Sequence, residues 1–173
     1  FSLTHTSKSA VVLGLQSQFR QYIIDAQATL DAVISLSNNC VVTSSGKLKC
    51  WGANNFASVG DGTNTNRTSP VWIDTSTTYL SVASRYLSNC GITSAHVLKC
   101  WGYGGSYVLG NGGAMDLSTP TVIDAGTQYS FVSPGTVVSC GVTITGDLKC
   151  WGTGATNIVN SSTPVVIDSG ETY

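Results

Sequence analysis

One pattern, two cysteines separated by nine residues and followed directly by Trp-Gly, occurs three times in this chain. The copies begin at Cys40, Cys90 and Cys140, at intervals of 50 residues. A fixed period of about 20 to 50 residues is typical of repeat proteins, in which each repeat is one supersecondary unit. We therefore expect three copies of one unit.

Each copy predicts a β-hairpin closed by a disulfide bond. In the first copy Gly46 can adopt the positive φ of a tight turn, and folding about Ser45 places Cys40 opposite Cys50. Cysteines that face each other across two strands are close enough to bridge. The second copy has His96 in place of the glycine, so we expect its turn to differ. The predicted disulfides are Cys40–Cys50, Cys90–Cys100 and Cys140–Cys150.

Metal binding is the alternative for these cysteines. Thiolates bind zinc, but structural zinc sites use closely spaced cysteine pairs, and His5 and His96 do not recur with the repeat. Residues 61–66 faintly resemble a calcium loop, yet the glycine at the sixth position of such a loop and the glutamate at its twelfth position are lacking. An aspartate recurs at the end of the last strand of each repeat, at Asp74, Asp124 and Asp168. We interpret these aspartates as turn residues that cap the strand. The alternative is a ring of carboxylates that binds a metal or takes part in catalysis. We expect no metal and no other cofactor.

The residues after each second cysteine form a further pattern of glycines, a polar turn and a later proline. In the first copy these residues are Trp51, Gly52, Asn54, Gly60, Asp61, Gly62, Thr63 and Pro70. The second copy has Trp101, Gly102, Gly105, Leu109, Gly110, Asn111, Gly112 and Pro120. The third copy is six residues shorter, lacks the Gly-Asp-Gly turn, and keeps Trp151, Gly152, Asn157 and Pro164.

This pattern resembles the repeats of the regulator of chromosome condensation family. The resemblance covers roughly residues 30 to 173 and implies four-stranded blades of a β-propeller. The paired cysteines resemble the extracellular, mostly bacterial branch of these repeats. The guanine-nucleotide exchange and chromatin binding of the nuclear members are not carried over, because the basic surfaces behind those roles are not found in this sequence.

The expected architecture is an all-β repeat domain of three propeller-blade-like units of about 50 residues with an N-terminal helix. Residues 1–30 are assigned to a leader and a helical stalk, and the repeats to about 31–79, 80–129 and 130–173. Apolar residues recur every three or four positions between Ala10 and Ala32, which predicts an amphipathic helix. This helix is interpreted either as an oligomeric stalk or as a helix that packs on its own domain.

Three blades predict assembly with other chains. Propellers close with about four to eight blades, and exposed edge strands pair readily with other chains. We expect a homo-oligomer, with a trimer favoured over a dimer or a monomer. A helix that leads into a disulfide-bonded β tip resembles the end of a trimeric bacterial or phage-like fibre.

Composition excludes several classes of protein. The net charge is −1 and charged residues are 10% of the chain, so nothing indicates nucleic-acid binding. No apolar run reaches the length of about 18 residues that membrane insertion needs. No phosphate-binding or dinucleotide motif occurs, and no catalytic constellation is found, so the prediction is that the chain is not an enzyme. Hairpin disulfides persist in oxidising compartments, so we expect an extracellular or cell-surface location, with the periplasm as a variant.

Candidate ligand-binding residues are those that depart from the repeat, because core positions recur and binding positions need not. Aromatic and arginine side chains dominate binding hot spots. These candidates are Arg67, Trp72, Arg85, Tyr86, Tyr103, Tyr107 and Asp116. The structural alternative is that Trp72 packs between blades and that the two candidate tyrosines near the glycine turn fill space. The recurring Trp51, Trp101 and Trp151 are assigned to the core.

The sequence thus predicts a non-catalytic cell-surface recognition domain, the receptor- or glycan-binding tip of an oligomeric adhesive fibre. Its expected partners are a cell-surface glycan or an envelope protein. A protein-docking module of an extracellular surface assembly and a free secreted lectin are the alternatives.

Overall fold

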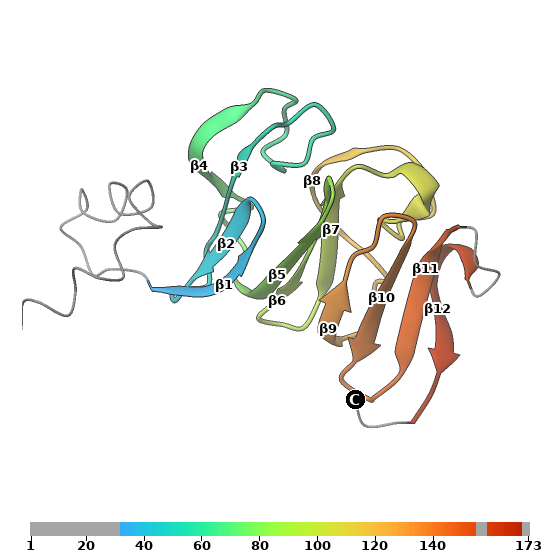
Figure 1. Ribbon diagram of the computed structural model, residues 1–173. Helices are drawn as coiled ribbons and strands as arrows, with labels where there is room; N and C mark the ends of the chain where they lie inside the picture. Colours follow the sequence, from blue (N-terminus) through green and yellow to red (C-terminus); the bar gives the residue numbers. More distant parts are fainter. Residues whose placement is uncertain (1–31, 155–158, 171–173) are drawn as a thin grey trace, which may run out of the picture. The chain divides into compact units, whose positions relative to one another are not determined.

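The computed structural model describes residues 32–154 and 159–170 of the chain (Figure 1). The predicted leader and stalk, residues 1–30, lie outside the described residues. In the part that is described, no helix has the length and apolar character needed to cross a membrane.

The described chain forms three antiparallel sheets of four strands, each with its strands in sequence order. The first sheet contains β1 (Val33–Ser37), β2 (Cys40–Thr43), β3 (Leu48–Gly52) and β4 (Arg67–Ile73). The second contains β5 (Tyr79–Arg85), β6 (Ser88–Thr93), β7 (Leu98–Gly102) and β8 (Leu117–Val122). The third contains β9 (Tyr129–Ser133), β10 (Val138–Thr143), β11 (Leu148–Thr153) and β12 (Asn160–Asp168). A short 3-10 helix, η2 (Gly105–Tyr107), precedes β8. The predicted all-β repeat fold is confirmed.

The three predicted disulfides are confirmed. Cys40 pairs with Cys50 across β2 and β3, and the equivalent pairs occur in the other two sheets. The Cα atoms of each bonded pair are 4.1 Å apart, a separation that antiparallel partners provide directly.

The turn of the second hairpin does not differ as expected. His96 adopts the left-handed conformation, with φ of 61°, close to the 76° of Gly46 and the 89° of Gly146. A side chain is unfavourable there. The His96 backbone oxygen accepts a hydrogen bond from Tyr129 N, and its ring Nδ1 lies 3.0 Å from the Tyr129 carbonyl oxygen. These contacts with the following sheet hold the histidine in a glycine-like turn.

The sheets pack face to face in chain order. We call the face on the side of the preceding sheet the front face and the opposite face the back face, and use the same names for the corresponding faces of the first and third sheets. The back face of the first sheet supplies the Cys40–Cys50 disulfide, Val42 and Leu48 to a buried cluster. The front face of the second sheet supplies Tyr79, Val82 and Trp101 to the same cluster. A second cluster repeats this arrangement with Cys90, Ile92, Leu98, Cys100, Tyr129, Val132 and Trp151.

A loop of each preceding sheet covers the tryptophan of the next. A Cβ atom at Gly60 would lie 2.6 Å from the Trp101 ring, and one at Gly110 would lie 2.8 Å from the Trp151 ring. Both tryptophans are fully buried. Trp51 differs from the predicted core position, since it is only partly buried. The reason is its place on the front face of the first sheet, where the described residues include no preceding sheet.

An ion pair joins each sheet to the next. Lys99 Nζ lies 2.6 Å from Asp74 Oδ2, and Tyr79 donates a hydrogen bond of 2.7 Å to the same oxygen. Burial opposes ionisation of the carboxyl group, but the hydrogen bonds from Lys99 and Tyr79 outweigh it, so the pKa of Asp74 lies below its ordinary value. Burial and the bond to the carboxylate raise the pKa of Tyr79. The second junction has the same contacts among Asp124, Lys149 and Tyr129.

The alternative of a carboxylate ring is therefore wrong for Asp74 and Asp124. Each carboxylate is bound by a lysine of the following sheet, and the two aspartates belong to different junctions. Within residues 32–154 and 159–170, no three histidine, cysteine, aspartate or glutamate side chains gather where they could hold a metal ion.

Candidate binding site at the first sheet junction

Three aromatic side chains from separate loops meet beside the junction of the first and second sheets. Tyr103 lies between the other two rings, with its centroid 5.5 Å from that of Phe56 and 6.4 Å from that of Tyr86. Both contacts are edge-to-face, with interplanar angles of 89° and 87°. This is the arrangement that aromatic pairs prefer. We call Phe56, Tyr86 and Tyr103 the aromatic cluster.

Tyr86 reaches the cluster because the first hairpin of the second sheet is long. The pair Leu36–Val41 in the first sheet is equivalent to the pair Val82–Gly91 in the second. Beyond this equivalent pair, the hairpin of the second sheet continues to the pair Arg85–Ser88, so Tyr86 lies at its tip. Tyr86 is 70% exposed and has a φ of 57°, a left-handed conformation that is unfavourable for a tyrosine.

Tyr103 is fixed against the base of the same hairpin. Its backbone N–H donates to the Leu87 carbonyl oxygen at 3.1 Å, and its own carbonyl accepts a bond of 2.8 Å from the Ser88 hydroxyl. The preceding Gly102 has a φ of 94°, and a Cβ atom there would clash with the Leu87 carbonyl oxygen. The ring of Tyr103 covers Gly105, where a side chain would clash with the phenol.

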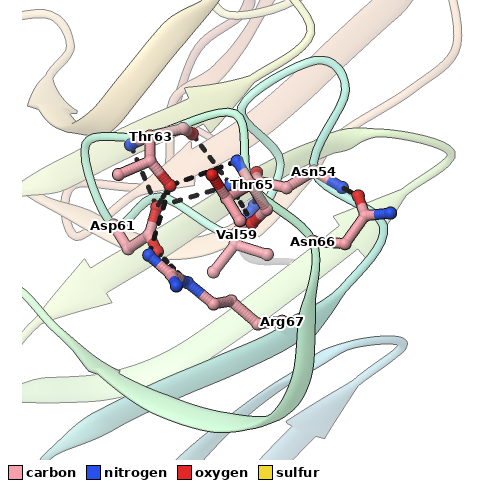
Figure 2. A network of polar contacts seen from close by, with 7 residues as sticks. All are labelled: Asn54, Val59, Asp61, Thr63, Thr65, Asn66 and Arg67. Carbon is pink, nitrogen blue, oxygen red and sulfur yellow. Dashed lines mark hydrogen bonds and ion pairs between the residues drawn. The ribbon is translucent and has the colours of Figure 1, made fainter.

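Phe56 belongs to a loop that a buried asparagine holds rigid. The Asn54 side chain donates hydrogen bonds to the carbonyl oxygens of Thr63 and Thr65 and accepts one from Val59 N, and its backbone N–H donates to Asn66. Figure 2 shows these residues gathered around Asn54 in the centre of the loop. Every polar atom of the Asn54 side chain is therefore used inside the protein, and the loop can present Phe56 in a fixed position.

The acidic residue of this loop is also used internally. Arg67 Nε lies 2.5 Å from Asp61 Oδ2. Thr63 donates its backbone N–H and hydroxyl to Asp61 Oδ1, and Figure 2 marks the contacts around Asp61 with dashed lines. Burial opposes ionisation, but hydrogen bonds from Thr63 and Arg67 outweigh it, so the pKa of Asp61 lies below its ordinary value.

The structure brings only some of the predicted site residues together. Tyr86 and Tyr103 belong to the aromatic cluster, and the exposed Arg85 precedes Tyr86 in the hairpin. Arg67 is bound to Asp61, and Asp116 accepts a hydrogen bond of 2.9 Å from Gly104 N. The latter two residues therefore stabilise loops.

Trp72 and Tyr107 lie elsewhere. Trp72 is half-exposed on β4, and Lys49 Nζ lies over its ring at 4.0 Å from the centroid. It therefore does not pack between two described sheets. Tyr107 ends η2 with a φ of 57° and is partly buried.

Phe56 is the member of the site that sequence reasoning missed. One period later the chain has Ser106, so the departure from the repeat was present in the sequence. Phe56 lies in a polar loop, and only the folded chain shows that it contacts Tyr103.

No protein-family model matches the chain, and no curated protein sequence matches it. Solved structures do. Human WBSCR16 superposes with a TM-score of 0.68 at 16% identity, over 76% of this chain and 36% of that one. Yeast RCC1 (Prp20) in complex with Kap60 gives a TM-score of 0.65 at 18% identity, over 78% and 36% of the two chains. Prp20p from Saccharomyces cerevisiae gives 0.67 at 19% identity, over 82% and 39%.

This chain thus spans 36% to 39% of the length of these proteins. At such low identity the likeness establishes the fold. The three sheets are β-propeller blades of the type found in RCC1-repeat proteins, and the predicted resemblance is confirmed at the level of the fold.

Proposed function

We propose that this chain is a non-catalytic recognition domain and that the aromatic cluster contacts its ligand. The observation that supports this proposal is the contrast between two equivalent places in the molecule. Phe56, Tyr86 and Tyr103 surround the first junction, whereas the residues one period later at the second junction are Ser106, Thr136 and Thr153. Packing of the blades does not require the rings, so their presence at one junction favours a binding role.

Three disulfides indicate that the domain folds in an oxidising environment. We place it outside the cell or on a cell surface, as the receptor- or glycan-binding tip of an oligomeric, by preference trimeric, adhesive fibre. A tyrosine ring held at a hairpin tip, as Tyr86 is, offers a flat apolar face with a polar edge, which suits the face of a sugar ring.

The test is binding of the full chain to a glycan panel and to isolated envelope proteins, with two matched variants. Tyr86→Thr introduces the residue of the second junction, and Trp72→Val introduces the residue found at Val122 and Val166. We expect Tyr86→Thr to weaken binding at least about tenfold, as for an interface hot spot. We expect Trp72→Val to leave the affinity of a single chain for its ligand unchanged. Equal affinities of wild type and Tyr86→Thr would contradict the proposal.

A second candidate is a protein-docking module of an extracellular assembly. Met115 and Arg85 are exposed in the loops of the second sheet that also carry Tyr103 and Tyr86, and methionine and arginine are enriched at protein interfaces. The structures of yeast RCC1 describe a complex with Kap60 and binding to Gsp1p and histones, so propeller blades of this type occur in proteins with protein partners. Capture of one envelope protein together with an unreactive glycan panel would favour this candidate. Glycan binding by a monomer would favour a free lectin.

A further inference from the structure

The two blade junctions inside the chain show which side chains a pair of packed faces contributes. At each junction the back face supplies a disulfide and aliphatic residues, and the front face supplies a tryptophan, a tyrosine and a valine. The first sheet has a front face, and the third sheet a back face, on which the described residues place no further sheet.

The front face of the first sheet keeps the register of a buried interface but is exposed. Leu36 occupies the strand position of Val82, which is 5% exposed, yet Leu36 itself is 59% exposed. The cross-strand row continues from Leu36 through the buried Val41 and the charged Lys49 to the half-exposed Trp72. Exposed apolar side chains thus occupy both ends of the row, and such side chains are typical of a face that packs against another sheet.

The back face of the third sheet has the same character. Val142 and Leu148 are partly exposed, whereas the residues at their positions in the other sheets, among them Ile92 and Leu98, are fully buried. Phe131, which pairs with Val142, is 61% exposed. The described sheets therefore present one exposed apolar face of each kind.

The two exposed faces differ from the internal ones in complementary ways. We call the first strand of each sheet (β1, β5 or β9) its innermost strand. On internal front faces this strand carries Tyr79 or Tyr129, but the first sheet has Val33 at that register. On internal back faces the innermost strand carries Ser35 or Ser81, but the third sheet has Phe131.

The exposed front face thus lacks the aromatic ring of the internal front faces, and the exposed back face has a ring that the internal back faces lack. If two exposed front faces packed together, neither innermost strand would contribute a ring. If two exposed back faces packed together, both would. Only front against back restores the single ring of the internal junctions.

The outer edges of the sheets are not suited to assembly. The outermost strands β4, β8 and β12 contain Pro70, Pro120 and Pro164 respectively. Proline removes a backbone donor and blocks addition of a further strand. Pairing of strand edges stays a prediction, and the faces of the sheets offer a second route to assembly.

We infer that a second copy of this chain packs the back face of its third sheet on the front face of the first sheet. The contact continues the internal blade junctions from one copy to the next. Contacts of this head-to-tail type close into rings when the rotation per copy allows it. Assembly through these faces is proposed independently of the ligand that the aromatic cluster binds.

The experiment uses variants that block one face each. Leu36→Asp places a charge on the front face and Phe131→Asp places one on the back face. We expect the wild type to have a mass in light scattering that is a multiple of the 18.0 kDa chain, and each variant alone to be a monomer. Mixed in equal amounts, the two variants retain one intact pair of faces and should form a dimer. Met115→Asp, with the same charge on an exposed loop residue, should keep the wild-type mass.

Three results would overturn the inference. The first is a monomeric wild type, and the second is a wild-type mass that neither face variant changes. The third is loss of assembly in Leu36→Asp but not in Phe131→Asp, which would indicate two front faces packed together. Should an aspartate variant fail to fold, Phe131→Ser, which carries the residue of the internal back faces, provides the same test.

Discussion

The first and second blade junctions have the same framework and different surroundings. Both have the lysine–aspartate–tyrosine contacts, a buried tryptophan under a glycine, and a disulfide on the back face. They differ in the loops beside the junction, where the first has the aromatic cluster and the second has three hydroxyl-bearing residues: Ser106, Thr136 and Thr153. The residues that hold the blades together recur at both junctions, whereas the rings of the aromatic cluster do not.

The loops at the two junctions are also stabilised by different residues. Asn54 fills the first loop with hydrogen bonds, whereas the equivalent position in the second loop is Gly104. A side chain at Gly104 would clash with the Met115 carbonyl oxygen, so the second loop closes over a glycine instead of an asparagine. The first loop is therefore the more dependent on a single side chain.

The largest expected effect on stability is the loss of that side chain. Asn54→Ala removes the donors to Thr63 and Thr65 and the acceptor for Val59 N inside a buried loop. We expect a loss of about 3 kcal/mol in the free energy of unfolding, because buried groups are left unpaired. Chemical denaturation measures it. Asn55→Ala, at the exposed neighbouring position, is the matched control and should change stability little.

The ion pairs should contribute equally at the two junctions. Asp74→Asn and Asp124→Asn each remove the charge that a largely buried lysine faces, at the same distance of 2.6 Å. We expect each to lower the free energy of unfolding by about 2 kcal/mol. A clearly larger loss at one junction would show that the two frameworks are not equivalent.

The same aspartates predict an acid dependence. Their pKa values are lowered in the folded protein, so the stabilisation is complete above their ordinary value of about 3.9 and is lost as the pH falls through the lower folded value. Unfolding free energy measured down to about pH 2 should fall less steeply in the double variant Asp74→Asn/Asp124→Asn than in the wild type. Identical slopes would contradict this assignment.

A smaller difference is expected between the two buried tryptophans. Trp151 Nε1 donates a bond of 2.7 Å to the Val108 carbonyl oxygen, whereas Trp101 Nε1 has no hydrogen-bond partner among the described residues. Replacement by phenylalanine removes similar volume at both positions. Trp151→Phe should therefore destabilise the protein by about 1 kcal/mol more than Trp101→Phe. Thermal or chemical unfolding of the two variants compares them directly.

The smallest expected effect on stability belongs to the most exposed ring of the cluster. Tyr86→Gly relieves an unfavourable left-handed φ and loses one edge-to-face contact with Tyr103. These effects oppose each other, so we expect a net change within about 0.5 kcal/mol. Ligand binding should nevertheless be lost. A large destabilisation would assign Tyr86 to the framework and weaken the contrast between the junctions.

Much of the blade architecture could be predicted from the sequence, because it depends on short-range spacing. Nine residues between cysteines, with a glycine in between, place Cys40 opposite Cys50 whatever the rest of the chain does. Where the pattern was irregular, at His96, the expected difference in the turn was wrong. Contacts with the following sheet outweigh the unfavourable conformation of that histidine.

The candidate site was predicted in part. Tyr86 and Tyr103 were found as departures from the repeat, but Arg67 and Asp116 met the same criterion and stabilise loops instead. Sequence spacing does not show whether a polar side chain in a loop bonds to its own backbone or faces solvent. Phe56 was missed because only the fold brings its loop to the hairpin that carries Tyr86.

The sequence by itself determined the repeat, its period, the hairpins and the disulfide pairing, since each follows from residues within one unit of about 50 positions. Only the tertiary structure decided which tryptophans are buried, which aspartates bind which lysines, and which rings form the cluster. Those outcomes depend on the face that one sheet presents to the next. Trp51 and Trp101 have the same local sequence, Lys-Cys-Trp-Gly, and Trp101 alone has a preceding sheet and loop packed over it in the described chain.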